Sequence, residues 1–529
     1  MNNAIIKLLT ITLLFSIYSS AFAQDIEVHI GNSIRADKRE KVLSVFPTED
    51  GIIALRVKYK LLGNPSYAIE VLDNQMNFVS RNDLELPDKD LEFSNLMYIN
   101  NKLYIFMKKY DSQNNINSLY GTTISSEGNF DSEIFEIVQV AVESRRKMNL
   151  FRIEPSADST QFKIIITPRT QDKDQMGLRQ FIILDQAFGE VDNVQINFPF
   201  KERDFSIKSS RLDPSGNIHM LCSVNIEESK RTIFKTNSET EARVFTLYKG
   251  ESEIKEYTIN FLNEDAGFIS QIKMNTDKKG KLQCTGFYSD KKGNSTRGVF
   301  VFTIDPATKE ISNSTSQAFT DEYLNQFLSE REIRKKDRKQ DKNKGFNRFD
   351  RLYNYRIRNV VMKEGGGFYI VAEYYFMKIT SYTDSKGNVR YTYHYYYDDL
   401  MVINVEADNE VTWYSKVPKR QYSTNDGGDY SGIVTGINKD NSLNIIFNDN
   451  MENANSMAQI NTKPVKLKNS VVVLVKFDEV GNATKSPLIE ADKSKMYLIP
   501  SASPKGLENN LILYSFGKNK NRFVNVILK

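Results

Sequence analysis

The chain has few of the residues that build metal centres and covalent cross-links. Its 529 residues include only two cysteines, three histidines and one tryptophan. His29, His219 and His394 are far apart in the sequence, and none has metal-ligand spacing to another. Two cysteines do not make a disulfide framework. The composition therefore predicts no cofactor and no metal site built on histidine and cysteine.

The chain also lacks a strong net charge and the common catalytic motifs. Its formal net charge is +4, which argues against a nucleic-acid partner bound by overall charge. No nucleophile elbow, phosphate-binding loop or dinucleotide fingerprint is found. The segment Phe151–Pro155 differs from the arginine motif of sialidases by an extra Glu154, and the adjacent carboxylates Asp398 and Asp399 would point to opposite faces of a strand. We therefore nominate no catalytic residue, and binding is favoured over catalysis.

The N-terminus has the three parts of a secretory signal peptide. Lys7 supplies the positive region, Leu8–Ile17 is a short apolar stretch, and Ala21-Phe22-Ala23 is a cleavage signal. Cleavage after Ala23 predicts a mature chain of residues 24–529. No later stretch is long and apolar enough to span a bilayer, so no transmembrane segment is expected in the mature chain. We expect an exported protein that is periplasmic, outer-membrane-associated or extracellular.

Two series of turns alternate along the remaining sequence. In the first, a Gly or Asn turn precedes an alternating apolar run, as where Asp50-Gly51 precedes Ile52–Leu55. In the second, an Asp-led turn follows a strand, as at Asp478–Asn482. The first series has eight members and the second seven. The alternation predicts units of two hairpins, which is typical of a β-propeller with four-stranded blades.

The two ends of the chain complement each other. The last unit is one strand short, and the mature N-terminus begins with an unassigned strand, Ile26–Ile30. We predict one closed all-β propeller over 24–529, with eight blades favoured over seven and the N-terminal strand completing the last blade. The Asp213-Pro214-Ser215-Gly216-Asn217 turn resembles those of secreted bacterial β-propeller-like repeat proteins of uncharacterised function. This resemblance implies the fold and no particular activity.

A charged insertion interrupts the predicted strands at 321–345. Asp321 is expected to cap a helix whose apolar residues from Tyr323 to Leu328 repeat at helical spacing. A basic run follows from Arg331 to Lys344. It could dock an acidic partner, a phosphate-bearing glycan or a lipid surface, or it could be a solvated helix face. The candidate partner-binding residues here are Arg331, Arg334, Lys335, Lys336, Arg338 and Lys339.

A long tyrosine-rich hairpin is predicted at 368–405, with a turn at Asp384–Asn388. Its tyrosines Tyr391, Tyr393, Tyr395 and Tyr397 alternate along one strand and share one face. Because the hairpin exceeds the length of a blade, its tip should project from the face that carries the long connections, one of which is predicted at 414–430. Projecting tyrosines suit protein contacts and sugar stacking, although tyrosine also suits strands in general.

Two smaller features lead to structural expectations. Asn425–Asp429 clusters oxygen atoms on a glycine turn, but it lacks the register of a calcium loop and is interpreted as a plain turn. Cys222 and Cys284 lie at even offsets from the turns before them, so both should point to the same side of their own sheets. Facing partners would need opposite sides, which predicts two free, buried thiols.

Taken with the expected export, these features favour a binding or scaffold protein of the bacterial cell envelope. The expected partner is another envelope protein, engaged through the loop-bearing face of the propeller. The alternative is a carbohydrate-binding or glycan-cleaving propeller, and a purely structural component is a third interpretation. The oligomeric state is left open.

Overall fold

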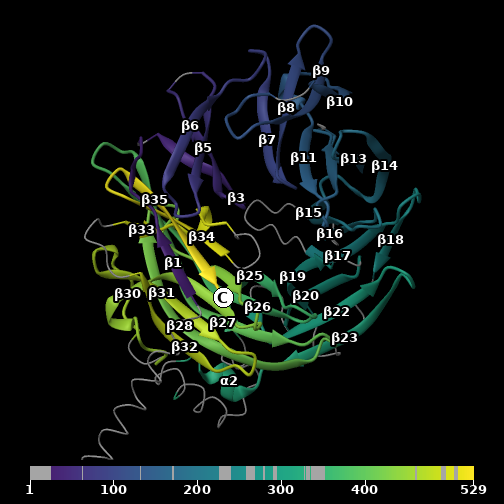
Figure 1. Ribbon diagram of the computed structural model, residues 1–529. Helices are drawn as coiled ribbons and strands as arrows, with labels where there is room; N and C mark the ends of the chain where they lie inside the picture. Colours follow the sequence, from purple (N-terminus) through teal and green to yellow (C-terminus); the bar gives the residue numbers. More distant parts are fainter. Residues whose placement is uncertain are drawn as a thin grey trace, which may run out of the picture. The chain divides into compact units, whose positions relative to one another are not determined.

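The computed structural model describes residues 26–529, with gaps at 38, 62, 131–132, 170–171, 226–239, 258–267, 278–279, 290–294, 327, 329–333, 335–351, 459–461, 490–495 and 505–509. The predicted signal peptide lies outside the described residues. Seven four-stranded antiparallel sheets and one sheet with a short fifth strand account for nearly all of the described secondary structure (Figure 1). The chain is thus an all-β propeller with eight blades, as favoured from the turn series, and not seven.

The chain divides into two compact units. The first comprises Met1–Leu84, Arg358–Val405 and Thr412–Lys529, and the second comprises Glu85–Ile357 and Glu406–Val411. Each unit contains four blades, with β25 and β28 each crossing a unit boundary near one end. Within most blades the strands follow one another in sequence order, which is the meander that the paired hairpins predicted.

The blades of the first unit are as follows. One contains β3 (Glu40–Thr48), β4 (Gly51–Lys58), β5 (Ser66–Asp73) and β6 (Phe78–Leu84). The next contains β25 (Tyr355–Met362), β26 (Phe368–Thr383), β27 (Val389–Val405) and β28 (Val411–Thr424). A third contains β29 (Val434–Ile437), β30 (Leu443–Asn450), β31 (Ser470–Phe477) and β32 (Ala483–Ile489), with short 3₁₀ turns at Met451–Asn453 and Leu467–Asn469. The fourth contains β33 (Tyr497–Leu498), β34 (Asn510–Gly517), β35 (Lys520–Leu528) and β1 (Ile26–Ile30), with η4 (Pro500–Ala502) after β33 and β2 (Ile34–Arg35) also on β35.

The second unit contains the other four blades. The first contains β7 (Glu92–Ile99), β8 (Lys102–Asp111), β9 (Ile116–Ile124) and β10 (Phe135–Ala141). The second contains β11 (Leu150–Pro155), β12 (Gln161–Thr167), β13 (Met176–Asp185) and β14 (Glu190–Lys201), and the third contains β15 (Phe205–Leu212), β16 (Ile218–Asn225), β17 (Thr240–Leu247) and β18 (Ile254–Tyr257). The fourth contains β19 (Phe268–Thr276), β20 (Leu282–Ser289), β22 (Gly298–Asp305) and β23 (Glu310–Ala318). A 3₁₀ turn lies at Arg145–Lys147, helix α2 at Asp321–Asn325, and a two-stranded ladder joins β21 (Ser295–Thr296) to β24 (Leu352–Tyr353).

The N-terminal strand completes the last blade, as predicted. β1 pairs antiparallel with β35 along its whole length, from Ile26 opposite Leu528 to Ile30 opposite Val524. Figure 1 shows the purple first strand beside the yellow last one. The two ends of the chain are therefore fastened to each other by main-chain hydrogen bonds, and β1 covers the edge of β35.

Apolar layers between neighbouring blades form the core of each unit. In several blades the second strand is buried along nearly its whole length, as in β4 and β30, because side chains on both of its faces meet a neighbouring blade. Tyr369, Val402 and Val473 share one such layer in the first unit. Each cysteine packs in the apolar layer between its own blade and the blade before it in the sequence. Cys222 and Cys284 therefore point to the same side of their respective sheets. Both cysteines are buried and free, which confirms the prediction.

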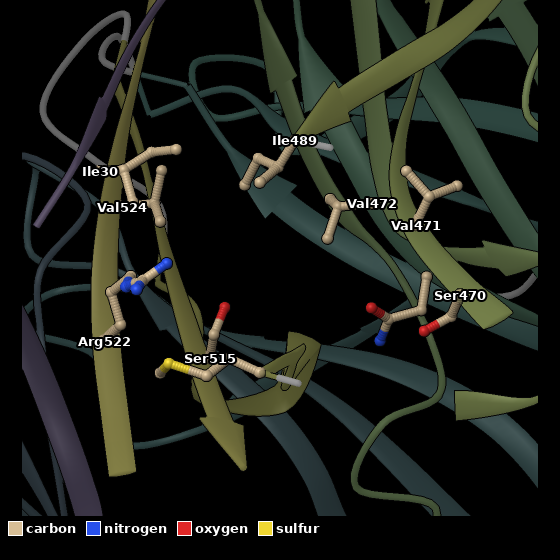
Figure 2. Close-up of a pocket in the computed structure, with 10 residues that line it drawn as sticks. Ile30, Ser470, Val471, Val472, Ile489, Ser515, Arg522 and Val524 are labelled. Atoms are coloured by element: carbon tan, nitrogen blue, oxygen red, sulfur yellow. The ribbon is translucent and has the colours of Figure 1, made fainter. Parts of the chain in front are cut away.

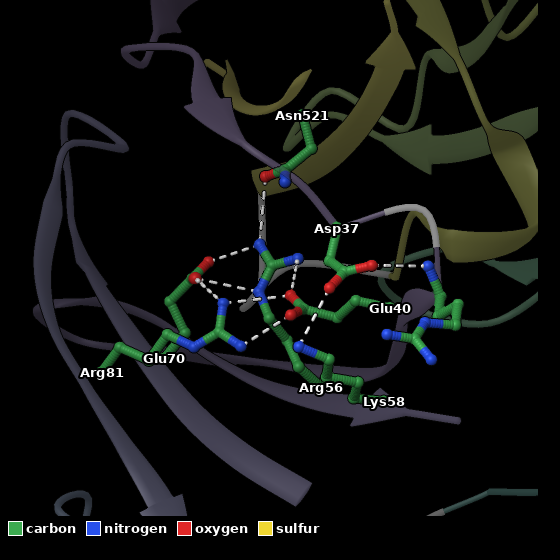
Figure 3. Close-up of polar contacts among 8 residues, drawn as sticks. Asp37, Glu40, Arg56, Lys58, Glu70, Arg81 and Asn521 are labelled. Atoms are coloured by element: carbon green, nitrogen blue, oxygen red, sulfur yellow. Dashed lines mark hydrogen bonds and ion pairs between the residues drawn. The ribbon is translucent and has the colours of Figure 1, made fainter. Parts of the chain in front are cut away.

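A buried charge cluster joins the first blade to the last one (Figure 3). Arg56 on β4 donates to both carboxylate oxygens of Glu70 on β5, at 2.9 and 2.5 Å, and to the Asn521 carbonyl oxygen on β35 at 3.0 Å. Arg81 on β6 donates at 2.7 and 3.0 Å to Glu40 on β3, which also lies 3.3 Å from Arg56. Each strand of the blade thus contributes one charged side chain, and Arg56 carries the contact to β35.

Two sequence expectations about connections need correction. Thr320, and not Asp321, caps α2, because its hydroxyl accepts from the Tyr323 amide. The helix ends at Asn325 and Leu328 lies in a bend, so the expected helical run through Leu328 is wrong, although Tyr323 and Leu324 are buried. Residues 414–430 are also not a long loop, because β28 continues to Thr424.

None of the described helices is long and apolar enough to cross a membrane.

Candidate functional site

The hairpin of β26 and β27 is the longest element of the molecule, with strands of 16 and 17 residues. Its inner half, from Phe368 to Glu373 and from Leu400 to Val405, is buried among the blades. Its outer half is exposed and closes in the turn that starts at Asp384, where the carboxylate accepts hydrogen bonds from the amides of Lys386 and Asn388. The prediction of an unusually long hairpin is confirmed.

One face of the outer half carries no charged side chain. The register places Met377 opposite Tyr395, Ile379 opposite Tyr393, Ser381 opposite Tyr391 and Thr383 opposite Val389. We call Met377, Ile379, Val389, Tyr391, Tyr393 and Tyr395 the tyrosine face. Five of these side chains are exposed by 39–59%: Met377, Ile379, Val389, Tyr391 and Tyr393. The opposite face is mixed: it carries the charged Lys378 and Arg390 together with the exposed aromatic rings of Phe376 and Tyr382.

Tyr397 shares the register of the tyrosine face but lies at its base. Its ring meets Tyr375 edge-on at 4.9 Å, and the Arg358 guanidinium lies 5.3 Å from the centre of the Tyr397 ring. Gly428 packs on the same ring, where an added Cβ would lie 2.8 Å from it. Burial raises the pKa of Tyr397 to about 12. Tyr397 therefore supports the hairpin, whereas Tyr391 and Tyr393 are available for contact.

Buried charges hold this base in place. The Lys419 ammonium group is fully buried and contacts Glu373 at 2.8 Å, and it donates to the Tyr397 carbonyl and to Gln421, also at 2.8 Å. Arg358 donates to the other Glu373 oxygen at 2.7 Å. Burial lowers the pKa of Lys419, while Glu373 opposes that change. These contacts cross the blade under the hairpin and fix the direction in which it projects.

Asp398 is the one carboxylate here with a strongly raised pKa. Burial raises its pKa to about 6 from the ordinary 3.8, against the attraction of Lys419 and with the help of neighbouring Asp399. Because the folded-state pKa lies above the unfolded value, this group favours the folded state most below about pH 4. That contribution is lost as the pH rises through 6. Asp399 is held differently, since it pairs with Lys416 at 3.0 Å.

Arg334 is the one residue of the basic run 331–344 that the structure describes. Arg334 is exposed and helical. Arg331, Lys335, Lys336, Arg338 and Lys339 lie outside the described residues. The proposed role of this segment stays a prediction.

The Asn425–Asp429 loop is a turn that braces the hairpin. Asn425 exchanges hydrogen bonds with the Tyr393 backbone through its side chain and its amide, at 2.9 and 3.0 Å. The Asp426 carboxylate accepts from the Ser423 hydroxyl and the Gly428 amide, which closes the loop on itself. No group of three or more His, Cys, Asp or Glu side chains among the described residues is arranged to hold a metal ion.

Two hollows lie in the first unit, and they differ greatly in size. The smaller has a volume of about 30 Å³ between β30–β31 and β34–β35, and Figure 2 shows Ser515 and Arg522 facing it from one side and Ser470 from the other. This volume suits buried water and no larger ligand. The second is a groove of about 660 Å³, lined by β3, by 499–504, by Tyr514 and Phe516, and by Asp429 and Tyr430. Its volume is typical of ligand sites.

Sequence reasoning found the tyrosines but missed the rest of these surfaces. Met377, Ile379 and Val389 follow from the hairpin register, which the turn at 384–388 could have supplied. The groove joins residues 40–46 to residues 429–430 and 499–516, and no local pattern connects such distant segments.

Comparisons with known proteins give only coarse likenesses in fold. No family model matches the chain, and no curated protein matches it by sequence. The β-propeller domain of the Trilobed protease from Pyrococcus furiosus is 11% identical with a TM-score of 0.32, over 73% of this chain and 96% of that one. Pyrococcus horikoshii acylaminoacyl peptidase is 10% identical with a TM-score of 0.31, over 86% of this chain and 58% of that one. An oligogalacturonate lyase in complex with manganese is 7% identical with a TM-score of 0.31, over 83% and 96%.

Proposed function

We propose that this chain is an exported binding protein of the bacterial cell envelope that engages a protein partner through the tyrosine face. The observation that carries the proposal is the charge-free, exposed face on the outer half of the β26–β27 hairpin. Tyrosine and methionine are enriched at protein interfaces, and rigid aromatic side chains supply large contact areas at low entropic cost. The buried ion pairs at the hairpin base hold this face in place before a partner arrives.

The composition of the face favours a protein over a glycan. Sugar recognition combines aromatic stacking with polar groups that bind the hydroxyls. Around Tyr391 and Tyr393 the neighbours on the same face are Ile379, Met377 and Val389, and the polar side chains are only Ser381 and Thr383. An apolar surface of this kind gains most by excluding water against another apolar surface.

The test compares two paired alanine variants in the native envelope. One carries Tyr391→Ala and Tyr393→Ala on the hairpin, and the control carries Phe78→Ala and Val79→Ala, which are similarly exposed on β6. After chemical cross-linking and affinity purification, we expect one protein to be recovered with the wild type and the control and to fall at least about tenfold with the tyrosine variant. Unchanged recovery would refute the protein-binding role. Loss of glycan retention instead would favour the carbohydrate-binding alternative.

Two further arms test the parts of the proposal that come from the sequence. Deletion of residues 322–344 tests whether the basic insertion contributes to the same complex. If recovery of the partner falls as far as in the tyrosine variant, the insertion and the tyrosine face belong to one interface. Fractionation of cells that express the full chain tests export, because recovery of the uncleaved chain in the cytoplasm would contradict it.

A further inference from the structure

The groove in the first unit faces the open edge of a β-sheet. β3 is the end strand of its sheet and pairs only with β4. Seven consecutive residues of β3, Glu40 to Phe46, line the groove. Since successive side chains of a strand point to opposite faces, seven in a row can border one space only if the edge of the strand faces it. The unpaired backbone groups of that edge are therefore directed toward the groove.

The far wall of the groove is the segment Ile499–Pro504 together with Tyr514 and Phe516. It adjoins β3, because Ile499 and Phe516 pack in one apolar cluster with Val45. Ser503 fixes the segment, because its hydroxyl donates to the Ile499 carbonyl and accepts from the Tyr514 amide, both at 2.9 Å. A strand added to the edge of β3 would thus extend the sheet and meet this wall with one of its faces.

One part of the lining carries an exposed negative charge. Asp429 lines the groove, and none of the described residues donates a hydrogen bond to its carboxylate. Burial, with the nearby Asp426, raises the pKa of Asp429, while Lys41 opposes the change. Glu40 also borders the groove, but its charge is already matched by Arg56 and Arg81. Asp429 is accordingly the carboxylate that a cationic group of a ligand would meet.

We propose that this groove binds an extended peptide segment of a partner protein, which adds to β3 as a further strand and places a lysine or arginine side chain against Asp429. Main-chain hydrogen bonds to a sheet edge supply affinity in this mode of recognition, and the flanking side chains supply specificity. Pro47, near the end of β3, agrees with an edge strand, where a missing amide is tolerated. None of the tyrosine-face residues lines the groove, although Asp429 ends the loop whose Asn425 braces the hairpin at Tyr393.

The experiment pans a phage library of random heptapeptides against the full chain and two variants. Ser501→Trp fills the groove from its far wall, Asp429→Asn removes the charge, and Glu479→Gln is the control at an exposed turn outside the groove. We expect enriched peptides with a basic residue at one fixed position. Their affinity should fall about tenfold in Asp429→Asn, be lost in Ser501→Trp and be unchanged in Glu479→Gln.

Methylation of single peptide amides then tests the strand addition itself. In a paired strand only alternate amides face the partner, so N-methylation should abolish binding at every second position and leave the others nearly unaffected. The proposal would be overturned if the effect of N-methylation did not alternate along the peptide, or if Ser501→Trp still bound the peptides. It would also be overturned if the enriched peptides shared no basic residue. Failure to enrich any peptide that competes for the groove would overturn it as well.

Discussion

Replacing Arg56 should loosen the first blade far more than replacing its neighbour Arg81. The Arg56 side chain is 2% exposed and meets Glu70, which is fully buried, whereas Arg81 is 34% exposed. Removing one partner of a buried ion pair leaves the other charge uncompensated and costs about 3–5 kcal/mol. A partly exposed pair costs about 0–1 kcal/mol. We therefore expect Arg56→Met to be several kcal/mol more destabilising than Arg81→Met.

The appropriate assay is hydrogen exchange resolved by strand. A chain with eight blades in two units need not unfold in one step, so a single midpoint would not report on this blade alone. A loss of about 3–5 kcal/mol should speed exchange of the protected amides in β4, β5 and β35 on the order of a hundred- to a few-thousand-fold. In Arg81→Met the change should stay within about fivefold.

A double variant separates lost charge compensation from lost packing. Arg56→Met with Glu70→Met replaces the buried pair by apolar side chains of similar length, and such replacements are often close to neutral. We expect it to recover most of the protection that Arg56→Met loses. Equal exchange in Arg56→Met and Arg81→Met, or a double variant worse than both single ones, would refute the reasoning.

Three other predictions follow from burial. Asp398→Asn should stabilise the protein by about 1–2 kcal/mol at pH 7 and by almost nothing at pH 4, because it removes a carboxylate whose pKa is about 6 in the folded state. Urea titrations at both pH values test this, with Asp399→Asn as the control. Without reductant, Cys222 and Cys284 should resist alkylation in the native state and both should react in denaturant, as measured by mass spectrometry. If both cysteines stayed unreactive in denaturant, they would form a disulfide and the prediction would be wrong. Gly286→Ala should destabilise β20 by several kcal/mol in the same urea assay, because the new Cβ would lie 2.1 Å from a backbone carbonyl, and a change below about 1 kcal/mol would contradict this.

The fold could be predicted from the sequence because its signals are local. Turns such as Asp478–Asn482 close on their own aspartate, with the Asp478 carboxylate accepting from the Asn482 amide at 2.7 Å. Runs such as Ile52–Leu55 are buried on both faces. The first turn series has eight members and the second seven, so counting them favoured eight blades and left the N-terminal strand unassigned.

The errors occurred where tertiary packing overrides local pattern. Residues 414–424 were expected in a long connection between blades, yet they belong to β28, where Lys419 is buried against Glu373 on β26. The apolar spacing from Tyr323 to Leu328 suggested a longer helix, but among the described residues of that stretch only Tyr323 and Leu324 are buried. The groove beside β3 was not foreseen, because its walls come from segments more than 380 residues apart.

The most direct test of the binding role is site-specific photo-cross-linking in the native envelope. A photoreactive phenylalanine analogue at Ile379, which is 50% exposed on the tyrosine face, is compared with the same analogue at Phe78, which is 48% exposed on β6. If the tyrosine face binds a protein, irradiation should yield one discrete cross-linked species from position 379 and none from position 78. No protein adduct from position 379, or the same adducts from both positions, would contradict the proposed function.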